Sequence, residues 1–401
     1  MRRNVIVRAI AAAVWLTLLA IPFVLFKADA VERTASLRPF MLLIVFAAAL
    51  PLSLLWNTLL ARRREETRTP VLDALRQRLH ENPVASRSLT GCIIIAAAVF
   101  PWVMPMYQTD IMSTALIYVM LGLGLNIVVG FGGQLNLGYV AFYAAGAYTY
   151  ALLNHHYKLD FWCALPLGGI VSMALAALIA LPLLRLKGDY LAIVTLAFAE
   201  IMRLVLENWG EVTFGPSGIA DIPRPALFGM TLPIADSSRL VFYIALALAL
   251  MTIVVIRRLE HSRLGRSWVA MREDELACQA MGINVPRIKL LAFVAGAAWA
   301  GFAGVLFAAK TQFINPASFT IWESLIVLGI VVLGGIGSVP GVIIAALVMT
   351  LLPEYLRAFA QYRLLIYGAL LVAVMIFRPG GLIPARRMQY RHNNEAERVD
   401  D

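Results

Sequence analysis

The chain has 401 residues, of which 61% are hydrophobic and only 14% are charged, and its mean hydropathy is +0.78. Soluble domains are closer to half apolar and a quarter charged, so this composition excludes an ordinary soluble protein. Several stretches of about 18 residues or more carry almost no charge, and each could cross the hydrocarbon core of a bilayer as a helix. The sequence therefore predicts an all-α, polytopic integral membrane protein with about 10 to 12 transmembrane helices.

The basic excess also restricts the function. The net charge is +10, but the lysines and arginines are scattered among loops between apolar stretches, where positive charge orients the spans. A nucleic-acid-binding protein would gather them on one domain, so membrane lipid is the expected contact and nucleic acid is not. Neither the three cysteines nor the five histidines show a metal-ligand spacing. We expect no catalytic residue, no metal site and no disulfide.

Residues 1–88 are expected to form an N-terminal extension with two transmembrane helices and a basic cytoplasmic linker. The first apolar run, residues 9–26, follows three arginines and precedes Ala28-Asp29-Ala30, which resembles a cleavage site. A removed signal peptide is therefore the alternative to a retained first helix. After the second run, residues 40–60, a linker at 62–87 contains seven arginines. Its middle is either an interfacial amphipathic helix or a solvated segment.

The other apolar runs fall in a main membrane domain, residues 89–384, followed by a cytoplasmic tail, residues 385–401. Basic residues concentrate in the tail and in the loops around 185–187 and 257–289, which places both termini in the cytoplasm if the number of spans is even. The loop 209–239 then lies outside, as an ordered cap or a plain connector. The expected spans are 89–106, 111–130, 135–154, 162–184, 190–208, 240–256, 288–309, 324–337, 339–356 and 364–377.

A glycine-rich stretch, residues 122–138, interrupts the apolar pattern, with five glycines among the twelve residues 122–133. Glycine permits close helix approach and lets the backbone bend beside a cavity, and amides at membrane depth need partners. The stretch is therefore either a broken or re-entrant element lining a translocation route, or small-residue helix packing with a tight turn. It is not a phosphate loop, because no Gly-Lys-Ser/Thr follows. The residues expected in the route are Asn126, Gly130, Gly133, Gln134 and Asn136.

A second interruption is predicted near residue 335, where glycine and proline are dense. Its broken-helix candidates are Gly334, Gly335 and Gly337. A further feature is a row of charges, Glu200, Arg203 and Glu207, whose spacing places them on one helix face. The row is either a structural ion pair near the water interface or part of a proton or ion relay.

A short polar stretch, residues 272–287, lies between two long apolar runs. Its composition predicts a helix up to Met281, which must lie outside the bilayer. Gly282 is suited to end this helix, because glycine accepts the left-handed conformation at a helix terminus. An exposed helix of this kind either docks in a groove of a partner protein or lies on the membrane surface without a partner. The residues expected at the contact are Glu273, Glu275, Ala277, Gln279 and Gly282.

Several motifs occur in one order along residues 109–384, and this order resembles the permease subunits of branched-chain amino-acid ABC importers. The stretch 272–282 resembles the cytoplasmic coupling loop of that family, although Leu276-Ala277 follows Glu275 where importers generally have two alanines. Including its extension, the chain is most similar to one of the two different permease types of such transporters. The other motifs are Gly124-Leu125-Asn126-Ile127-Val128-Val129-Gly130, Gly133-Gln134-Leu135-Asn136-Leu137-Gly138, Lys187-Gly188-Asp189-Tyr190 and Gly215-Pro216-Ser217-Gly218.

The resemblance implies a transport subunit without enzymatic activity in the bacterial inner membrane. It implies a pathway shared with a homologous permease subunit of the LivH type, and two ATPase subunits of the LivG and LivF types that bind ATP-Mg. Residues 275–282 would contact an ATPase subunit, and the loop 209–239 would face an external substrate-binding protein. The chain itself would bind no cofactor. The expected substrates are leucine, isoleucine and valine.

Two alternatives to this function remain open on the sequence. The first is an ion-coupled secondary transporter or channel, which would use Glu200 and the glycine breaks as an ion-coupled site. The second is an ABC importer of the same family for urea, short amides or other amino acids.

Overall fold

The computed structural model describes residues 26–29, 34–37, 83–183, 186, 188–226, 233–355, 368, 372, 376 and 380–384. The chain divides into two compact units, Met1–Ile93 and Ile94–Asp401. The two helices predicted before residue 61, the basic linker up to residue 82 and the C-terminal tail lie outside the described residues, as does most of the predicted span 364–377.

A small β-hairpin is present near the N-terminus, where the sequence predicted none. Strands β1 (Phe26–Asp29) and β2 (Thr34–Leu37) pair antiparallel, with Phe26 opposite Leu37. In the rest of the described chain the only β-pairing is one isolated bridge between Ile219 and Ile314, and the regular structure is helical. The predicted all-α class is confirmed.

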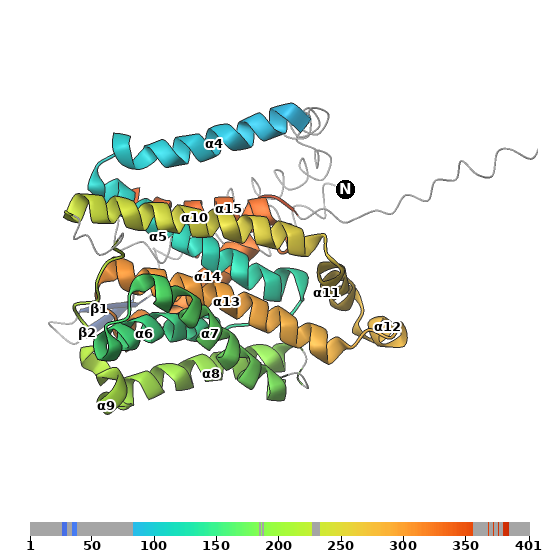
Figure 1. Ribbon diagram of the computed structural model, residues 1–401. Coiled ribbons are helices and arrows are strands. Elements are labelled where there is room, and N and C mark those ends of the chain that lie inside the picture. The colour runs from blue at the N-terminus through green and yellow to red at the C-terminus, as the bar shows by residue number, and fades with distance from the viewer. Residues whose placement is uncertain are drawn as a thin grey trace, which may run out of the picture. The chain divides into compact units, whose positions relative to one another are not determined.

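Twelve α-helices and three short helical turns make up the described part of the chain (Figure 1). The α-helices are α4 (Pro83–Val103), α5 (Met106–Leu125), α6 (Val140–Tyr157), α7 (Phe161–Leu183), α8 (Asp189–Asn208), α9 (Gly210–Thr213), α10 (Ile234–Glu260), α11 (Arg263–Glu273), α12 (Glu275–Ala280), α13 (Val285–Thr311), α14 (Ile321–Gly334) and α15 (Val339–Tyr355). The turns are a π-helix, η1 (Asn126–Phe131), and two 3-10 turns, η2 (Gly215–Ser217) and η3 (Pro316–Ser318).

Five helical stretches of the described chain are long and apolar enough to cross a membrane, which confirms a multi-pass protein. They are Met106–Phe131, Phe161–Leu183, Ile234–Glu260, Val285–Thr311 and Pro316–Gly334. Two apolar helices are shorter, Ile94–Val103 and Val339–Glu354. Helix α8 has 20 residues and is long enough to span, but it carries the charges Glu200, Arg203 and Glu207.

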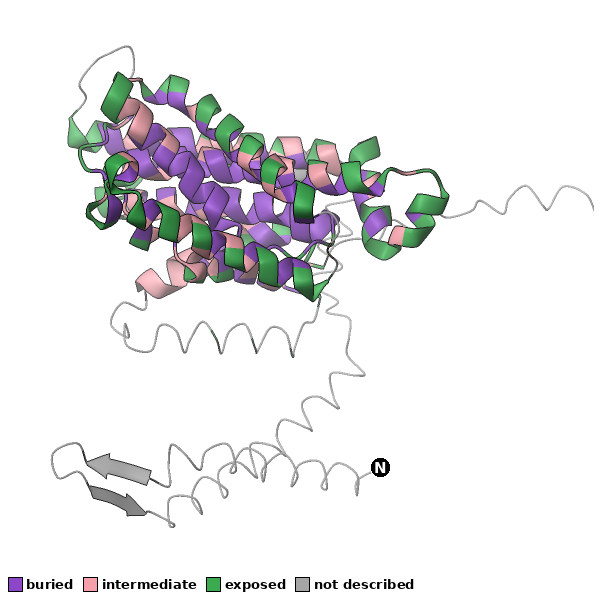
Figure 2. Cartoon of the chain, turned by 90° about the horizontal axis from the view of Figure 1, so that it is seen from below, coloured by how far each residue is buried: buried purple, intermediate pink, exposed green. Residues whose placement is uncertain are grey.

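The core of the second unit is built around α5 and α13. Helix α13 packs against α6 and α7, and α5 packs against α10, α13, α14 and α15. Buried residues line the centre of this bundle, while its outer faces are exposed (Figure 2). Glycines permit the closest approach: a Cβ at Gly301 would lie 2.5 Å from the Gly168 carbonyl oxygen and 2.6 Å from the Ser172 hydroxyl.

The described part of the predicted loop 209–239 is ordered rather than a plain connector. It contains α9 and η2, and Ile219 exchanges two backbone hydrogen bonds with Ile314, at N–O distances of 2.8 and 3.1 Å. The loop is also shorter than predicted, because α10 begins at Ile234. Residues 227–232 lie outside the described ranges. These contacts tie the loop to the segment that leads into α14.

Candidate functional site

The predicted glycine-rich interruption is present directly after α5. The helix widens into the π-helix η1 and ends at Gly132, after which Gly133 takes a left-handed conformation with φ 65°. A π-turn inside a helix is a strained insertion that is frequently found at functional sites. The helix is thus interrupted as predicted, and it also packs closely, since a Cβ at Gly124 would lie 2.9 Å from the Trp299 Cβ of α13.

The two predicted interruptions meet in space. The Asn126 side-chain oxygen accepts a hydrogen bond from the Gly337 backbone N–H at 2.9 Å, across 211 positions of sequence. Gly335 and Gly337, both with positive φ, separate α14 from α15. A Cβ at Gly130 would lie 2.8 Å from the Gly337 nitrogen. Asn126, Gly130 and Gly337 thus form one buried cluster, whereas Gly334, at the end of α14, and Gly335 precede it in the chain.

The segment after Gly133 is not helical, so the span predicted at 135–154 is wrong at its start, and α6 begins only at Val140. Asn136 accepts from the Gly138 N–H at 2.9 Å, a local turn that competes with helix formation. The Leu137 N–H donates to the Thr195 hydroxyl oxygen of α8 at 3.1 Å. These bonds hold the backbone outside a helix inside the bundle.

Three side-chain amides of this region are buried with an unsatisfied nitrogen. In the described part of the chain, the NH2 groups of Asn126, Gln134 and Asn136 have no hydrogen-bond partner. Leaving a buried donor unpaired costs about 1–3 kcal/mol. We expect these donors to be satisfied in another conformation, in which the segment shifts or meets water or a solute.

The polar stretch between α10 and α13 forms two helices, and the predicted single helix up to Met281 is wrong. Helix α11 ends at Glu273, and Asp274 is extended, with φ −153°. The Asp274 carboxylate accepts from the N–H groups of Leu276 and Ala277 at 2.8 and 3.0 Å, which makes it the N-cap of α12. Glu273 therefore lies on a different helix from Glu275, Ala277 and Gln279.

Gly282 ends α12 as predicted, with φ 79°. The Gly282 N–H donates a hydrogen bond to the Gln279 carbonyl oxygen, and the Ile283 N–H donates one to the Cys278 carbonyl oxygen, both at 3.0 Å. This pair of bonds is the Schellman arrangement, in which a left-handed residue satisfies the last carbonyls of a helix. The position requires glycine for its backbone conformation alone, because a Cβ there would meet no atom within 4 Å.

Gly282→Val is expected to loosen the end of α12, since a β-branched residue in the left-handed region costs about 1–2 kcal/mol. Amide hydrogen exchange at residues 281–283 of the purified chain should quicken by about tenfold, which corresponds to about 1.4 kcal/mol. Gly282→Asn is the control, because asparagine tolerates this conformation, and its exchange should stay close to that of the unmodified chain. Equal exchange rates in the Gly282→Val and Gly282→Asn variants would contradict the requirement for a left-handed residue at the end of α12.

The helix pair α11–α12 is fastened to the interrupted helix. Arg272 donates from Nη1 to the Gly130 carbonyl oxygen at 2.5 Å, and its Cγ lies 2.7 Å from where a Cβ of Gly133 would be. Gly133 thus leaves room for the arginine. Trp268 is buried and donates to the Ile288 carbonyl at 2.9 Å, which fixes α11 to the start of α13.

A salt bridge joins α12 to α13. The Lys289 Nζ lies 2.8 Å from the Glu275 Oε1, and the lysine side chain is only 10% exposed. Sequence reasoning placed Glu275 at a contact with a partner, whereas the structure turns its carboxylate toward Lys289. Ala277 and Gln279 are exposed, as is Glu273 on α11. Of the predicted contact residues, Glu275 thus anchors the helix and the others face outward.

Two residues at this surface were missed by sequence reasoning. Leu276 and Met281 are 69% and 82% exposed, although both are apolar. Leu276 lies on α12 and Met281 directly follows it, so a partner that covered this helix would bury both apolar side chains. The sequence signal that could have identified them is that both are large apolar residues within an otherwise polar stretch. Arg272 and Lys289 were also missed, because their partners are far away in sequence.

The fold and this site define a class: a multi-pass α-helical membrane protein whose interrupted helices are joined to an exposed pair of helices at one end of the bundle (Figure 1). No group of three or more His, Cys, Asp or Glu residues that could hold a metal occurs among the described residues. A family model described as "Branched-chain amino acid transport system / permease component" matches residues 107–377, and the chain belongs to this family.

Individual relatives agree with the family match and confirm the predicted resemblance. The chain is 48% identical over 319 residues to the high-affinity branched-chain amino acid transport system permease protein LivM of Salmonella typhimurium, covering 75% of each chain. It is 47% identical over 324 residues to LivM of Escherichia coli K12, covering 76% of each. It is also 26% identical over 285 residues to the permease protein LivH of E. coli K12, covering 66% of this chain and 91% of LivH. No solved structure matches the chain significantly.

Proposed function

We propose that the chain is the permease subunit of an ATP-driven importer of the branched-chain amino acids leucine, isoleucine and valine. The observation that carries the proposal is the direct bond between the exposed helix pair and the interrupted helix, from Arg272 to Gly130, in a chain of this family. A force applied to α11–α12 from outside the bilayer has a short path to the centre of the bundle.

The partners follow from the same proposal. A homologous permease subunit of the LivH type supplies the other half of the pathway, and an external binding protein delivers the amino acid. Two ATPase subunits bind and hydrolyse ATP-Mg, so this chain is not itself an enzyme. The complex lies in the bacterial inner membrane, and both termini of the chain are cytoplasmic. The basic residues of the chain, whose net charge is +10, concentrate in the loops and the tail assigned to that side, and this supports the orientation.

The described contacts support a route for coupling. Leu276 and Met281 are suited to enter an apolar groove of an ATPase subunit, because they are the exposed apolar side chains of α12 and its end. Closure of the ATPase subunits would move α12. The Glu275–Lys289 salt bridge would carry that movement to α13, and Arg272 would carry it to η1. The cluster around Asn126 would then open or close.

Reconstitution of the complete complex in liposomes tests the proposal. Uptake of leucine should require hydrolysable ATP and the binding protein, and unlabelled isoleucine and valine should compete with it. Competition by urea, amides or other amino acids instead would favour an importer of another substrate. Uptake that persists without ATP and follows an ion gradient would overturn the proposal in favour of a secondary transporter or channel.

Glu275→Gln is expected to reduce ATP-driven uptake at least tenfold, because it leaves the ammonium group of Lys289 nearly buried without its counter-charge, at a cost of about 3 kcal/mol. The double variant Glu275→Lys with Lys289→Glu should restore part of the uptake by re-forming the pair. Asp236→Asn is the matched control, because it breaks an exposed pair with Arg239 at the start of α10. Equal uptake by Glu275→Gln and Asp236→Asn would contradict the assigned role.

A further inference from the structure

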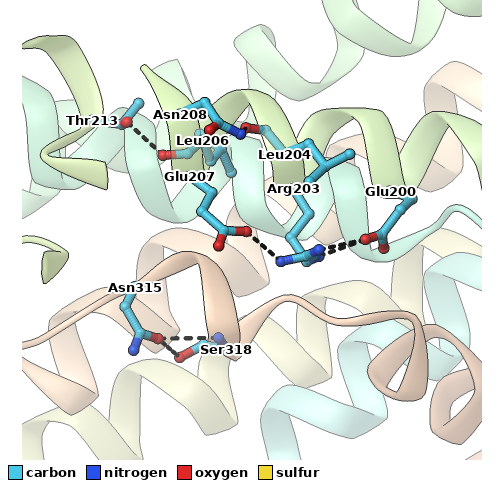
Figure 3. A network of polar contacts seen from close by, with 9 residues as sticks. All are labelled: Glu200, Arg203, Leu204, Leu206, Glu207, Asn208, Thr213, Asn315 and Ser318. Carbon is cyan, nitrogen blue, oxygen red and sulfur yellow. Dashed lines mark hydrogen bonds and ion pairs between the residues drawn. The ribbon is translucent and has the colours of Figure 1, made fainter. Parts of the chain in front are cut away.

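The predicted row of charges on α8 is an ion-paired triad. Arg203 lies between two carboxylates, 2.5 Å from the Glu200 Oε1 and 2.6 Å from the Glu207 Oε2 (Figure 3). The three side chains are between 24% and 37% exposed. Two carboxylates and one guanidinium leave a net charge of −1. The triad is therefore a partly open, negatively charged feature on the side of a helix.

The triad runs from near the middle of the helix, at Glu200, to its C-terminal end, where Glu207 precedes the last residue, Asn208. Glu200 follows Asp189, the first residue of α8, by eleven positions, which is about 16 Å at the helical rise. The whole helix is about 30 Å long, the thickness of the hydrocarbon core. Helix α8 lies along the same bundle as α13 (Figure 1). A charged group at the depth of Glu200 is expensive in lipid and is placed against protein or water.

The triad borders a broad apolar face of α8 that is exposed in the described part of the chain. The exposed residues of this face are Tyr190, Ile193, Val194, Ile201, Leu204 and Val205. Helix α7 offers a comparison, because it also exposes apolar side chains, among them Leu178 and Leu181, but contains no charged residue. An uncharged apolar face of this kind can contact lipid without leaving a charge in the hydrocarbon core. Lipid against α8 would meet the charges of Glu200 and Arg203 at the edge of the apolar face, which is unfavourable.

The opposite edge of α8 belongs to the interrupted region. The Thr195 hydroxyl oxygen accepts from the Leu137 N–H at 3.1 Å, and a Cβ at Gly138 would lie 2.8 Å from the Thr195 carbonyl carbon. The outer end of α8 approaches η3, where Asn315 bonds Ser318 across from the triad (Figure 3). A protein seated on the exposed face of α8 would therefore lie beside the proposed route.

We infer that the exposed face of α8, with its charged triad, is the surface that binds the second permease subunit; this rests on the proposed function. The partner is a homologue, as the similarity of this chain to LivH of E. coli K12 supports. Homologous subunits pair through related surfaces about a two-fold axis, so the partner presents its corresponding helix. Its chemistry is an apolar helix face with a basic or hydrogen-bond-donating side chain opposite the net negative charge of the triad.

Photo-crosslinking in the complete complex tests this inference. Benzoylphenylalanine is placed at Ile201 on α8 or, as the matched control, at Leu178 on α7, which are 58% and 68% exposed. The Ile201 position should yield an adduct with the second permease subunit, and the Leu178 position should yield lipid adducts only. Lipid adducts alone at Ile201, or an adduct between two copies of this chain, would overturn the inference.

Assembly gives an independent measurement that does not depend on crosslinking. Ile201→Trp adds bulk to an exposed position without disturbing the core, and it should lower the amount of second permease that co-purifies at least fivefold. Leu178→Trp, the matched control, should leave the amount of co-purified second permease unchanged. If the second permease does not co-purify with the unmodified chain, the proposed function fails. If it co-purifies equally with both variants and the Ile201 adduct is absent, only the assignment of α8 fails.

Discussion

Replacing Arg272 with glutamine is expected to uncouple the transporter: uptake should fall about ten- to hundredfold while the ATPase subunits continue to hydrolyse ATP. The guanidinium donates to the Gly130 carbonyl at 2.5 Å, and a hydrogen bond from a charged donor contributes about 1.5–3 kcal/mol. Glutamine is too short to span from α11 to η1. The measurement is leucine uptake and phosphate release by the same proteoliposomes.

Arg266→Gln is the matched control for this prediction. Arg266 lies on the same helix, α11, and also donates to a backbone carbonyl, that of His261 at 2.9 Å. Its bond is exposed and stays within the local chain, so its removal should leave uptake nearly unchanged. Equal uptake by the two variants would show that the Arg272 bond carries no coupling. The amount of each variant in the membrane must be measured alongside, because a loss of folded subunit would lower uptake and hydrolysis together.

Gly146→Ala is expected to remove most of the folded subunit from the membrane. Gly146 of α6 faces the Gly301 backbone of α13, and a Cβ there would overlap the Gly301 carbonyl oxygen and lie 2.7 Å from its Cα. Main-chain atoms of two packed helices cannot move aside as a flexible side chain can. Overpacking of a tight core costs about 1–3 kcal/mol, and contact with backbone lies at the upper end. Thermal unfolding in detergent and the amount of monodisperse protein measure the effect.

Gly210→Ala is the control for the packing prediction. This glycine also lies in a helix, α9, but a Cβ there would meet no atom within 4 Å. Alanine has a higher helix propensity than glycine by about 1 kcal/mol, so this variant should be as stable as the unmodified chain or slightly more so. If Gly146→Ala unfolds at the same temperature as Gly210→Ala, the contact between Gly146 and Gly301 does not limit stability.

Local properties of the sequence were enough to predict the class of the protein and where its helices break. Apolar length determines whether a segment can span a bilayer, and this depends on nearby residues alone. The same holds for Gly282, Gly335 and Gly337, whose positive φ is a property that glycine tolerates without help from the rest of the fold. The order of the motifs was sufficient for the family, which the match over residues 107–377 confirms.

Local properties failed where a side chain competes with the helix. Within a helix-prone stretch, Asp274 can be part of a helix or can cap the start of one. In the structure its carboxylate accepts hydrogen bonds from two N–H groups, and this splits the predicted helix into α11 and α12. Asn136 acts in the same way before α6, where its bond to Gly138 is supported by the contact of Leu137 with Thr195. Both residues are compatible with helix or turn, and the surrounding structure decided between the two.

Tertiary structure alone decided which distant residues act together. The bonds from Arg272 to Gly130 and from Gly337 to Asn126 join positions 142 and 211 residues apart, and no periodicity in the sequence encodes them. The same is true of α8: spacing placed Glu200, Arg203 and Glu207 together, but only packing showed that these side chains stay partly exposed in the described part of the chain. Helix formation depends on neighbours along the chain, whereas contacts between helices depend on how whole faces fit together.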